Sequence, residues 1–130
     1  MTTTLTDAER IAAAQAYIDA LVSHDADKVP FATGCTRVEM GLKTGFSGNH
    51  LRRSLNSGLQ YRVIRSSTVP EFTVVGDEIR ARFELVTKPT LVGRRVGARI
   101  DETFLIPAIS DTGRAEIHHI RAGIRPFLTS

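Results

Sequence analysis

Two ionisable side chains interrupt the apolar faces of two predicted strands near the C-terminus. Neighbouring side chains of a strand point to opposite faces of a sheet. His118 has the same parity as Ile120, so we expect it on the inner face, with His119 on the outer face. In residues 95–106, every second residue is expected to point inward, and these residues are apolar or small except for Glu102.

Glu102 and His118 can meet across a hairpin. If the hairpin closes around residues 107–113, the two side chains lie directly opposite or diagonal to each other and touch. If the turn is tight at residues 110–113, they lie several residues apart. The two registers remain alternatives.

The chemistry of such a pair depends on its surroundings. A buried carboxylate is unfavourable unless it is paired, and histidine is a suitable partner. A bare carboxylate in an apolar cavity has a raised pKa, which suits acid or base chemistry. The alternative is a closed Glu–His hydrogen bond that only holds the strand register.

The N-terminal part of the chain predicts helices. Residues 6–25 combine capping-box spacing of Thr6 and Glu9 with an apolar stripe of helical period that has Tyr17 at its edge. Asp25 can cap a second short helix that ends before Pro30.

The remaining elements are a third short helix at residues 49–55 and strands with a two-residue period. These expected strands cover residues 35–40, 59–68, 71–75, 78–87, 95–106 and 114–124. Helices followed by an antiparallel sheet define an α+β fold. No repeat or linker interrupts residues 1–130, which we expect to form a single domain.

Composition excludes several classes. Of the 130 residues, 42% are hydrophobic and 24% charged, and no apolar run is long enough to cross a bilayer, so we expect no membrane partner. The start lacks a secretory signal, and Cys35 is the single cysteine, which together favour the cytoplasm. The net charge of +3 is not accompanied by any nucleic-acid-binding motif, so we expect no nucleic-acid partner.

The sequence contains no motif that is typical of a metal or cofactor site. His118 and His119 diverge, and His24 and His50 lie on other elements without ligand spacing. Cys35 has no activating base nearby in the sequence, and no glycine-rich phosphate loop is present. We expect neither a metal nor a cofactor.

Three stretches resemble the nuclear transport factor 2-like superfamily, in particular its SnoaL-like and ketosteroid-isomerase-like branch. "AQAYIDALVSHDADKV" is similar to the first helix and following turn of that branch, and "TGFSGNHLRRSL" to its third helix. "DETFLIP" and "TGRAEIHHIRAGI" are similar to its closing hairpin. The resemblance extends from Thr6 to Phe127 and implies that residues 1–130 form a single SnoaL-like domain.

This resemblance implies helices on a strongly curved sheet, a cystatin-like α+β roll that forms a cone with an apolar pocket. Steroid isomerases of this type use a tyrosine, a protonated acid and an aspartate base. Tyr17 matches the tyrosine, and either Glu102 or Asp101 matches the acid, with Glu102 preferred by parity. Met40 stands in place of the base, and Glu39 is on the other face if Val38 points inward, so standard steroid isomerisation is not predicted.

Two functions are therefore compared. The first is proton transfer on a small apolar, steroid- or polyketide-like molecule by an isomerase, cyclase or hydratase, with His118 as base and Glu102 and Tyr17 orienting or donating. The second is a non-catalytic ligand-binding or dimerisation domain. The expected pocket lining is Phe31, Met40, Phe83, Phe104 and Ile120.

We also expect a homodimer through the outer face of the sheet. Ile117, Leu105 and Val86 are the apolar residues that we expect among the charges of that face. Exposed apolar side chains on a sheet face can mark an interface.

Overall fold

A computed structural model describes residues 2–128 of the chain, without the side chains of residues 59, 60, 90 and 91. Its helices are α1 (Asp7–Ser23), α2 (Gly48–Ser57) and α3 (Leu59–Arg62). Its strands are β1 (Thr3–Thr4), β2 (Phe31–Glu39), β3 (Leu42–Gly45), β4 (Ile64–Ser67), β5 (Glu71–Val75), β6 (Glu78–Leu91), β7 (Arg94–Leu105), β8 (Ile109–Ser110) and β9 (Ile117–Leu128).

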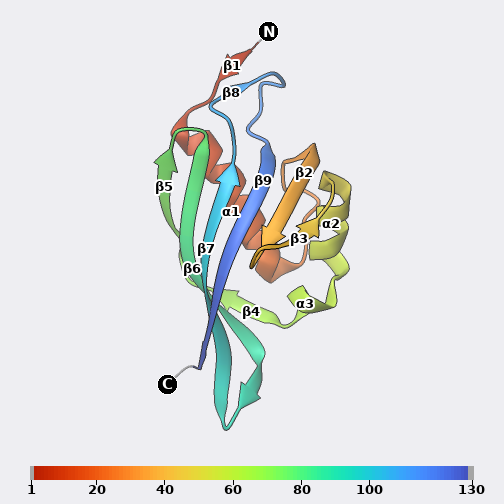
Figure 1. The fold of residues 1–130 in the computed structure, drawn as a ribbon, viewed down its shortest axis with the longest axis vertical. Helices are drawn as coiled ribbons and strands as arrows, with labels where there is room; N and C mark the ends of the chain where they lie inside the picture. The colour runs from red at the N-terminus through yellow and green to blue at the C-terminus, as the bar shows by residue number, and fades with distance from the viewer. Residues whose placement is uncertain (1, 129–130) are drawn as a thin grey trace.

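A curved seven-stranded sheet carries the helices on one side (Figure 1). The strand order is β3-β2-β9-β7-β6-β4, and β5 pairs with the first half of β6. Helix α1 packs against β4 and β6, whereas α2 packs against β2. The α+β fold and the curved sheet are confirmed, but the sheet is mixed, because β2 and β9 run parallel.

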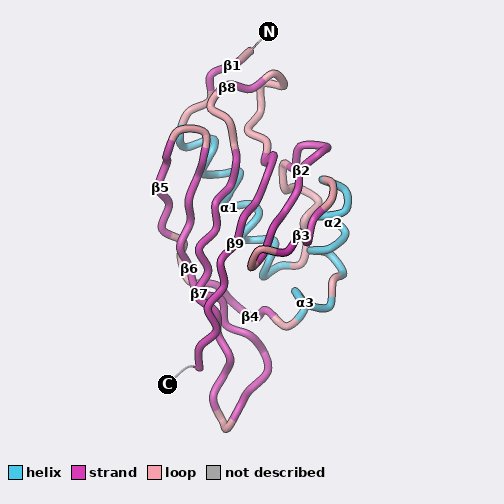
Figure 2. The backbone as a smooth tube through the Cα atoms, viewed as in Figure 1, coloured by secondary structure: helices cyan, strands magenta, loops and turns pink. Residues whose placement is uncertain are grey.

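The long strands β6, β7 and β9 form the centre of the sheet (Figure 2). The inward residues of β6 and β7 alternate as predicted, and the three strands bury a core against α1 that includes Ile79, Phe104 and Ile120. Helix α1 begins as predicted, because Thr6 accepts a hydrogen bond from the Glu9 amide and the Glu9 carboxylate accepts one from the Thr6 amide.

Two short elements differ from their predictions. Residues 26–29 form a turn instead of a helix, with the Asp27 amide donating to the Asp25 carboxylate. Residues 59–68 are divided between α3 and β4. No helix within residues 2–128 has the length and apolar character that crossing a membrane requires.

The hairpin between β7 and β9 settles the register question. Phe104 pairs with Ile120 and Glu102 pairs with Ala122, so the chain takes the longer hairpin that turns near residues 110–113. His118 lies before the first β7–β9 pair, Leu105 with His119. The expected contact between Glu102 and His118 is therefore wrong.

Helix α2 approaches β2 closely at Gly48. A Cβ atom at this position would lie 2.5 Å from the Ala32 carbonyl oxygen and 3.1 Å from Phe31 Cβ. Real Cβ atoms do not approach a backbone oxygen so closely, and therefore glycine allows α2 to seat on the strand.

We predict that Gly48→Ala destabilises the protein by about 1–3 kcal/mol, because the added methyl group forces α2 away from β2. Gly34→Ala in the same strand is the control, since its Cβ would meet nothing within 4 Å. Urea unfolding of both variants measures the difference. Equal stabilities of the two variants would contradict the close packing at Gly48.

Candidate functional site

A cavity of about 270 Å³ lies between the inner face of the sheet and the segment that carries α3 and β4. Its wall is mainly apolar, with four polar exceptions: Glu39, Tyr61, Thr87 and Glu102. The apolar lining residues are Leu21, Val63, Ile64, Leu85, Ala98, Ile100, Ala122 and Ile124. Val63 is the lining residue with the greatest exposure, 39%, and we therefore infer that the cavity opens beside it.

Glu102 lies at the closed side of this cavity. It is 4% exposed and pairs across the sheet with Ala81 on β6 and Ala122 on β9, whose small side chains leave space beside it. Its Oε2 atom is buried and has no hydrogen-bond partner in the described structure. Asp101, the alternative acid, is exposed and pairs with Arg82.

The pKa of Glu102 is raised to about 8, chiefly by burial, with the nearby Glu39 carboxylate adding to the shift and Arg37 opposing it. At pH 7 the protonated form of Glu102 therefore predominates. A neutral carboxylic acid with a free oxygen inside an apolar cavity can donate a hydrogen bond or a proton to a bound molecule.

Glu39 is a second carboxylate on the same row of the sheet. It ends β2 and pairs with Ala122 of β9, the residue that also pairs with Glu102 of β7. Strands lie about 4.8 Å apart, so the two backbone positions are about 10 Å apart, with only an alanine between them. Both carboxylates line the cavity.

The position of Glu39 corrects the expected faces of β2. Cys35 and Arg37 are buried, and Glu39 follows their parity. Met40 is 62% exposed in the turn after the strand, where its φ is +52°. A carboxylate is therefore present in the cavity next to the position where the resemblance places a base.

Tyr61 and Arg37 hold the Glu39 carboxylate in place. The Tyr61 hydroxyl lies 3.2 Å from Oε1 and 3.3 Å from Oε2, and donates to the carboxylate. Arg37 Nε lies 3.5 Å from Oε1, and the Arg37 guanidinium stacks 5.0 Å from the centre of the Tyr61 ring. Both contacts restrict the orientation of the Glu39 side chain.

Arg37 is itself fully buried. Its Nη1 donates to the Tyr17 hydroxyl at 3.2 Å, and its Nε donates to Thr44 Oγ1 at 3.0 Å. Its Nη2 donates to the Thr44 carbonyl oxygen at 3.1 Å and to Ser54 Oγ at 3.3 Å. The charge thus has partners on α1, α2 and β3 in addition to Glu39.

Tyr17 lies behind the cavity wall instead of on its surface. It is 1% exposed, and its ring packs edge to face against Phe104 at 5.4 Å and Phe31 at 6.1 Å. Burial raises the pKa of Tyr17 well above its usual value, and the Glu102 charge adds to this effect. Tyr17 therefore stays protonated and positions Arg37.

His118 is exposed and lines a separate surface pocket with Asp111 and Arg114. The expected inward orientation fails because Ile117 pairs with Phe31 and is fully buried, so it takes the inner position at the start of β9. The buried residues there are Ile117 and Ile120, three positions apart instead of two. His119 is half-buried, with its Nδ1 atom 2.7 Å from Thr36 Oγ1.

The expected ligand-binding residues do not line the cavity that contains Glu102. Phe31, Phe104 and Ile120 belong to the buried core, and Phe83 is buried on the neighbouring strand. Met40 is exposed. Apolar parity identifies inward residues, but it does not distinguish those that fill the core from those that border a cavity.

Arg37 and Tyr61, which the sequence predictions did not include, are the functional residues that the structure adds. One signal was available for Arg37: it shares parity with Cys35 and Glu39, so a cation and an anion lie two positions apart on one strand face. Tyr61 gave no such signal, since its segment resembled a strand and forms α3.

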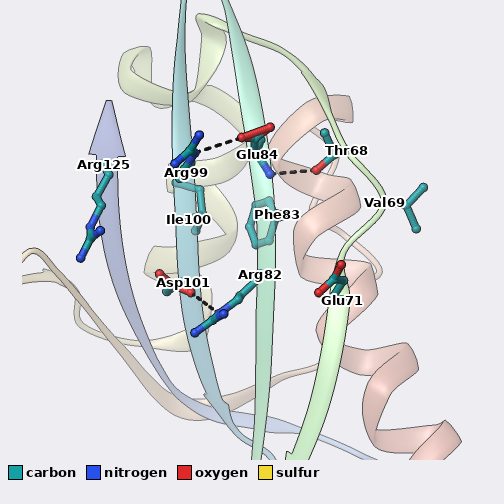
Figure 3. A pocket seen from close by; sticks show the side chains of 10 residues that line it. All are labelled: Thr68, Val69, Glu71, Arg82, Phe83, Glu84, Arg99, Ile100, Asp101 and Arg125. Atoms are coloured by element: carbon teal, nitrogen blue, oxygen red, sulfur yellow. Dashed lines mark hydrogen bonds and ion pairs between the residues drawn. The ribbon is translucent and has the colours of Figure 1, made fainter. Parts of the chain in front are cut away.

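The outer face of the sheet carries a second pocket, of about 590 Å³, shown in Figure 3. Four of its charged side chains form two ion pairs, with Arg82 3.0 Å from Asp101 and Arg99 3.3 Å from Glu84. These four side chains are 40–82% exposed. Such solvated pairs contribute little energy.

The homodimer through this outer face stays a prediction. Of its expected apolar residues, Leu105 is exposed and Val86 is half-buried. Ile117 belongs to the core and was wrongly placed on the outer face.

Residues 2–128 contain no group of three His, Cys, Asp or Glu side chains that can hold a metal ion. Cys35 is buried next to the site, and burial raises the pKa of its thiol to about 12, against the opposing effect of Arg37. The thiol therefore stays protonated and is a poor nucleophile.

We predict that Glu102→Gln changes the pH dependence of stability. Between about pH 4.5 and 8 the unfolded chain has released the Glu102 proton while the folded protein retains it, so the free energy of unfolding falls as pH rises through this window. The slope is up to about 1.4 kcal/mol per pH unit. Glu102→Gln removes this contribution, and urea unfolding at pH 5 and pH 8 measures it.

The exposed Glu71 provides the control for this measurement, because Glu71→Gln leaves the cavity intact. A wild-type slope identical to that of Glu102→Gln would mean that Glu102 titrates normally.

Comparisons with solved structures agree with this fold. A protein assigned as an isomerase of the SnoaL-like family from Agrobacterium tumefaciens is 12% identical, with a TM-score of 0.63 over 91% of this chain and 98% of that one. The hexachlorocyclohexane dehydrochlorinase LinA-type3 from Novosphingobium barchaimii is 14% identical, with a TM-score of 0.61 over 95% and 93%. A protein of unknown function with a cystatin-like fold from Nostoc punctiforme is 16% identical, with a TM-score of 0.59 over 95% and 96%.

At these identities the likeness establishes the fold alone, a cystatin-like, nuclear transport factor 2-like α+β fold. No curated protein matches the chain by sequence. One family model, described as a domain of unknown function, DUF8021, matches residues 3–124. Because this match spans nearly the whole chain, the protein belongs to the DUF8021 family.

Proposed function

We propose that the cavity binds a small, largely apolar molecule and that Glu39 and Glu102 move a proton on it. The observation that carries this proposal is the placement of two carboxyl groups, in different environments, on one row of the sheet inside the cavity. Pairs of titratable groups held in different protonation states are typical of acid–base sites.

The two groups have complementary roles in this proposal. Glu39, held by Arg37 and Tyr61, is the base that removes a proton from a carbon next to a carbonyl group. Glu102, protonated and without a partner at Oε2, donates a hydrogen bond to the oxygen on which negative charge develops. Return of the proton from Glu39 to another carbon completes an isomerisation without net proton release.

The surroundings limit the ligand. A volume of about 270 Å³ lies below the roughly 300–1,000 Å³ of pockets for drug-sized molecules. The mostly aliphatic wall disfavours a charged group near Glu102, because it offers no compensating cation beyond the buried Arg37. Isomerase, cyclase and hydratase reactions on small ketones or enones share these requirements.

Solved proteins of this fold include one assigned as an isomerase and one named as a dehydrochlorinase. Proton removal from carbon is a step that both kinds of reaction can use. This agreement supports the class of chemistry, whereas the alternative, a ligand-binding or dimerisation domain without catalysis, uses the same cavity.

The test is exchange of the α-protons of 2-tetralone in deuterium oxide, followed by proton NMR. We expect the wild-type protein to accelerate exchange and Glu39→Gln to reduce the rate by about 10²–10⁴-fold, because it removes the base. We expect Glu102→Gln to reduce the rate by about 10²–10³-fold, because it weakens stabilisation of the oxyanion.

Asp101→Asn is the matched control, since Asp101 adjoins Glu102 in sequence but is exposed on the outer face. It should exchange 2-tetralone at the wild-type rate. Binding of 2-tetralone with no acceleration of exchange would favour the non-catalytic alternative. Equal rates for wild type and Glu39→Gln would reject Glu39 as the base.

A further inference from the structure

The charge of the protein is unevenly distributed, with an excess of basic residues at one end. We define the basic end as residues 59–67, 86–99 and 124–128, which carry seven Lys or Arg residues and no Asp or Glu. The rest of the chain carries ten basic and fourteen acidic residues. The net charge of +3 therefore combines a cationic end with an anionic remainder, which a chain-wide count conceals.

The three segments lie together at one end of the molecule (Figure 1). The hairpin of β6 and β7 extends beyond the body, β4 crosses at its base, and the C-terminal part of β9 pairs with β7 beside it. The side chains of Arg62, Arg65, Lys88, Arg94, Arg99 and Arg125 are exposed there. Glu84, at the border of the basic end, pairs with Arg99.

The tip of this hairpin is an exposed valine. Val92 is 91% exposed and has φ +52°, and Gly93 follows with φ +74°. Leu91 and Arg94 pair across these two residues, which form a two-residue turn with positive φ at both positions. Asn-Gly is preferred in such turns, whereas a β-branched residue at positive φ is strained.

Valine is thus an unfavourable residue at position 92, because its backbone is strained in this turn and its apolar side chain is exposed to water. Two more aliphatic side chains are exposed at the same end, Val63 at 39% and Leu128 at 42%. Val63 also marks the opening of the cavity. Cations, exposed aliphatic side chains and the entrance to an apolar cavity therefore share one end of the molecule.

We propose that the basic end is a peripheral binding surface for anionic lipid bilayers, with Val92 entering the interface and the cations contacting headgroups. Basic residues near a negatively charged bilayer and an apolar residue that enters the boundary region are the two contributions that such binding combines. No membrane-spanning segment is needed. The cavity opening then faces the surface in which apolar molecules are dissolved.

Nucleic acid is the competing polyanion. Binding to single strands relies on exposed aromatic rings that stack on bases. In the described part of the basic end, Phe127 is half-buried with Arg99 over its ring at 5.6 Å, and Tyr61 is buried. The exposed apolar side chains are aliphatic, which favours the bilayer.

The test is co-sedimentation of the full chain with vesicles of phosphatidylcholine alone and of phosphatidylcholine mixed with phosphatidylglycerol, at constant salt. We expect enrichment on the anionic vesicles. Each Lys or Arg near such a surface contributes about fivefold to partitioning, so Lys88→Glu with Arg94→Glu should lower it by about thirtyfold or more. Lys28→Glu with Arg53→Glu is the control of equal net charge, placed outside the basic end.

Val92→Asn distinguishes a loss of membrane contact from a loss of stability. It creates the preferred Asn-Gly turn, so the melting temperature should stay equal or rise, while partitioning to anionic vesicles should fall by about tenfold. Ile109→Asn is the control, because Ile109 is 60% exposed on β8 at the opposite end of the molecule. It should partition like the wild-type protein.

Four outcomes would overturn the proposal. They are equal binding to neutral and anionic vesicles, equal weakening by the two charge-reversal pairs, unchanged partitioning of Val92→Asn, and tighter binding of a DNA oligonucleotide than of the vesicles. None of these results depends on the 2-tetralone experiment, so the surface and the proposed proton transfer can fail separately.

Discussion

The buried positive charge of Arg37 is the constraint around which the site is organised. An unpaired charge in a protein interior is strongly unfavourable, so the fold has to supply several partners at once. These partners come from elements far apart in the sequence: Tyr17 on α1, Thr44 on β3 and Ser54 on α2. Satisfying one guanidinium therefore fixes how the helices sit against the edge of the sheet.

The same guanidinium makes the two carboxyl groups of the cavity unlike each other. Glu39 has Arg37 and Tyr61 within contact distance, whereas Glu102 has apolar neighbours and an oxygen that has no partner among the described residues. Glu39 also raises the pKa of Glu102 and so favours the protonated form of that group. Small residues at Ala81 and Ala122 keep the space between them open.

The fold could be predicted from local patterns, because those patterns reflect interactions between near neighbours. The two-residue period correctly placed Glu102 inward and Asp101 outward, and the capping box located the start of α1. The choice of inner face in β2 failed, because it assumed that an apolar residue, Val38, takes precedence over Arg37. In the structure Arg37 is the buried residue. Its partners lie on other helices and strands, and the periodicity of β2 alone carries no information about them.

His118 shows a different limit. Its parity with Ile120 is real along the strand, but Ile117 takes the inner position where β9 begins beside Phe31. Parity holds only within a regular ladder, and the β7–β9 ladder begins at His119. The irregular start of a strand is set by contacts with a strand some 86 residues earlier, which no local pattern contains.

The central place of β9 in the sheet governs the order in which the chain can fold. Strand β2 is synthesised well before β9, yet its sheet neighbours are β3 and β9. Until β9 has been synthesised, β2 and β3 form only a two-stranded hairpin, which is marginally stable by itself. The row of Glu39, Ala122 and Glu102 thus assembles at the end of folding, through contacts of high sequence separation that slow the reaction.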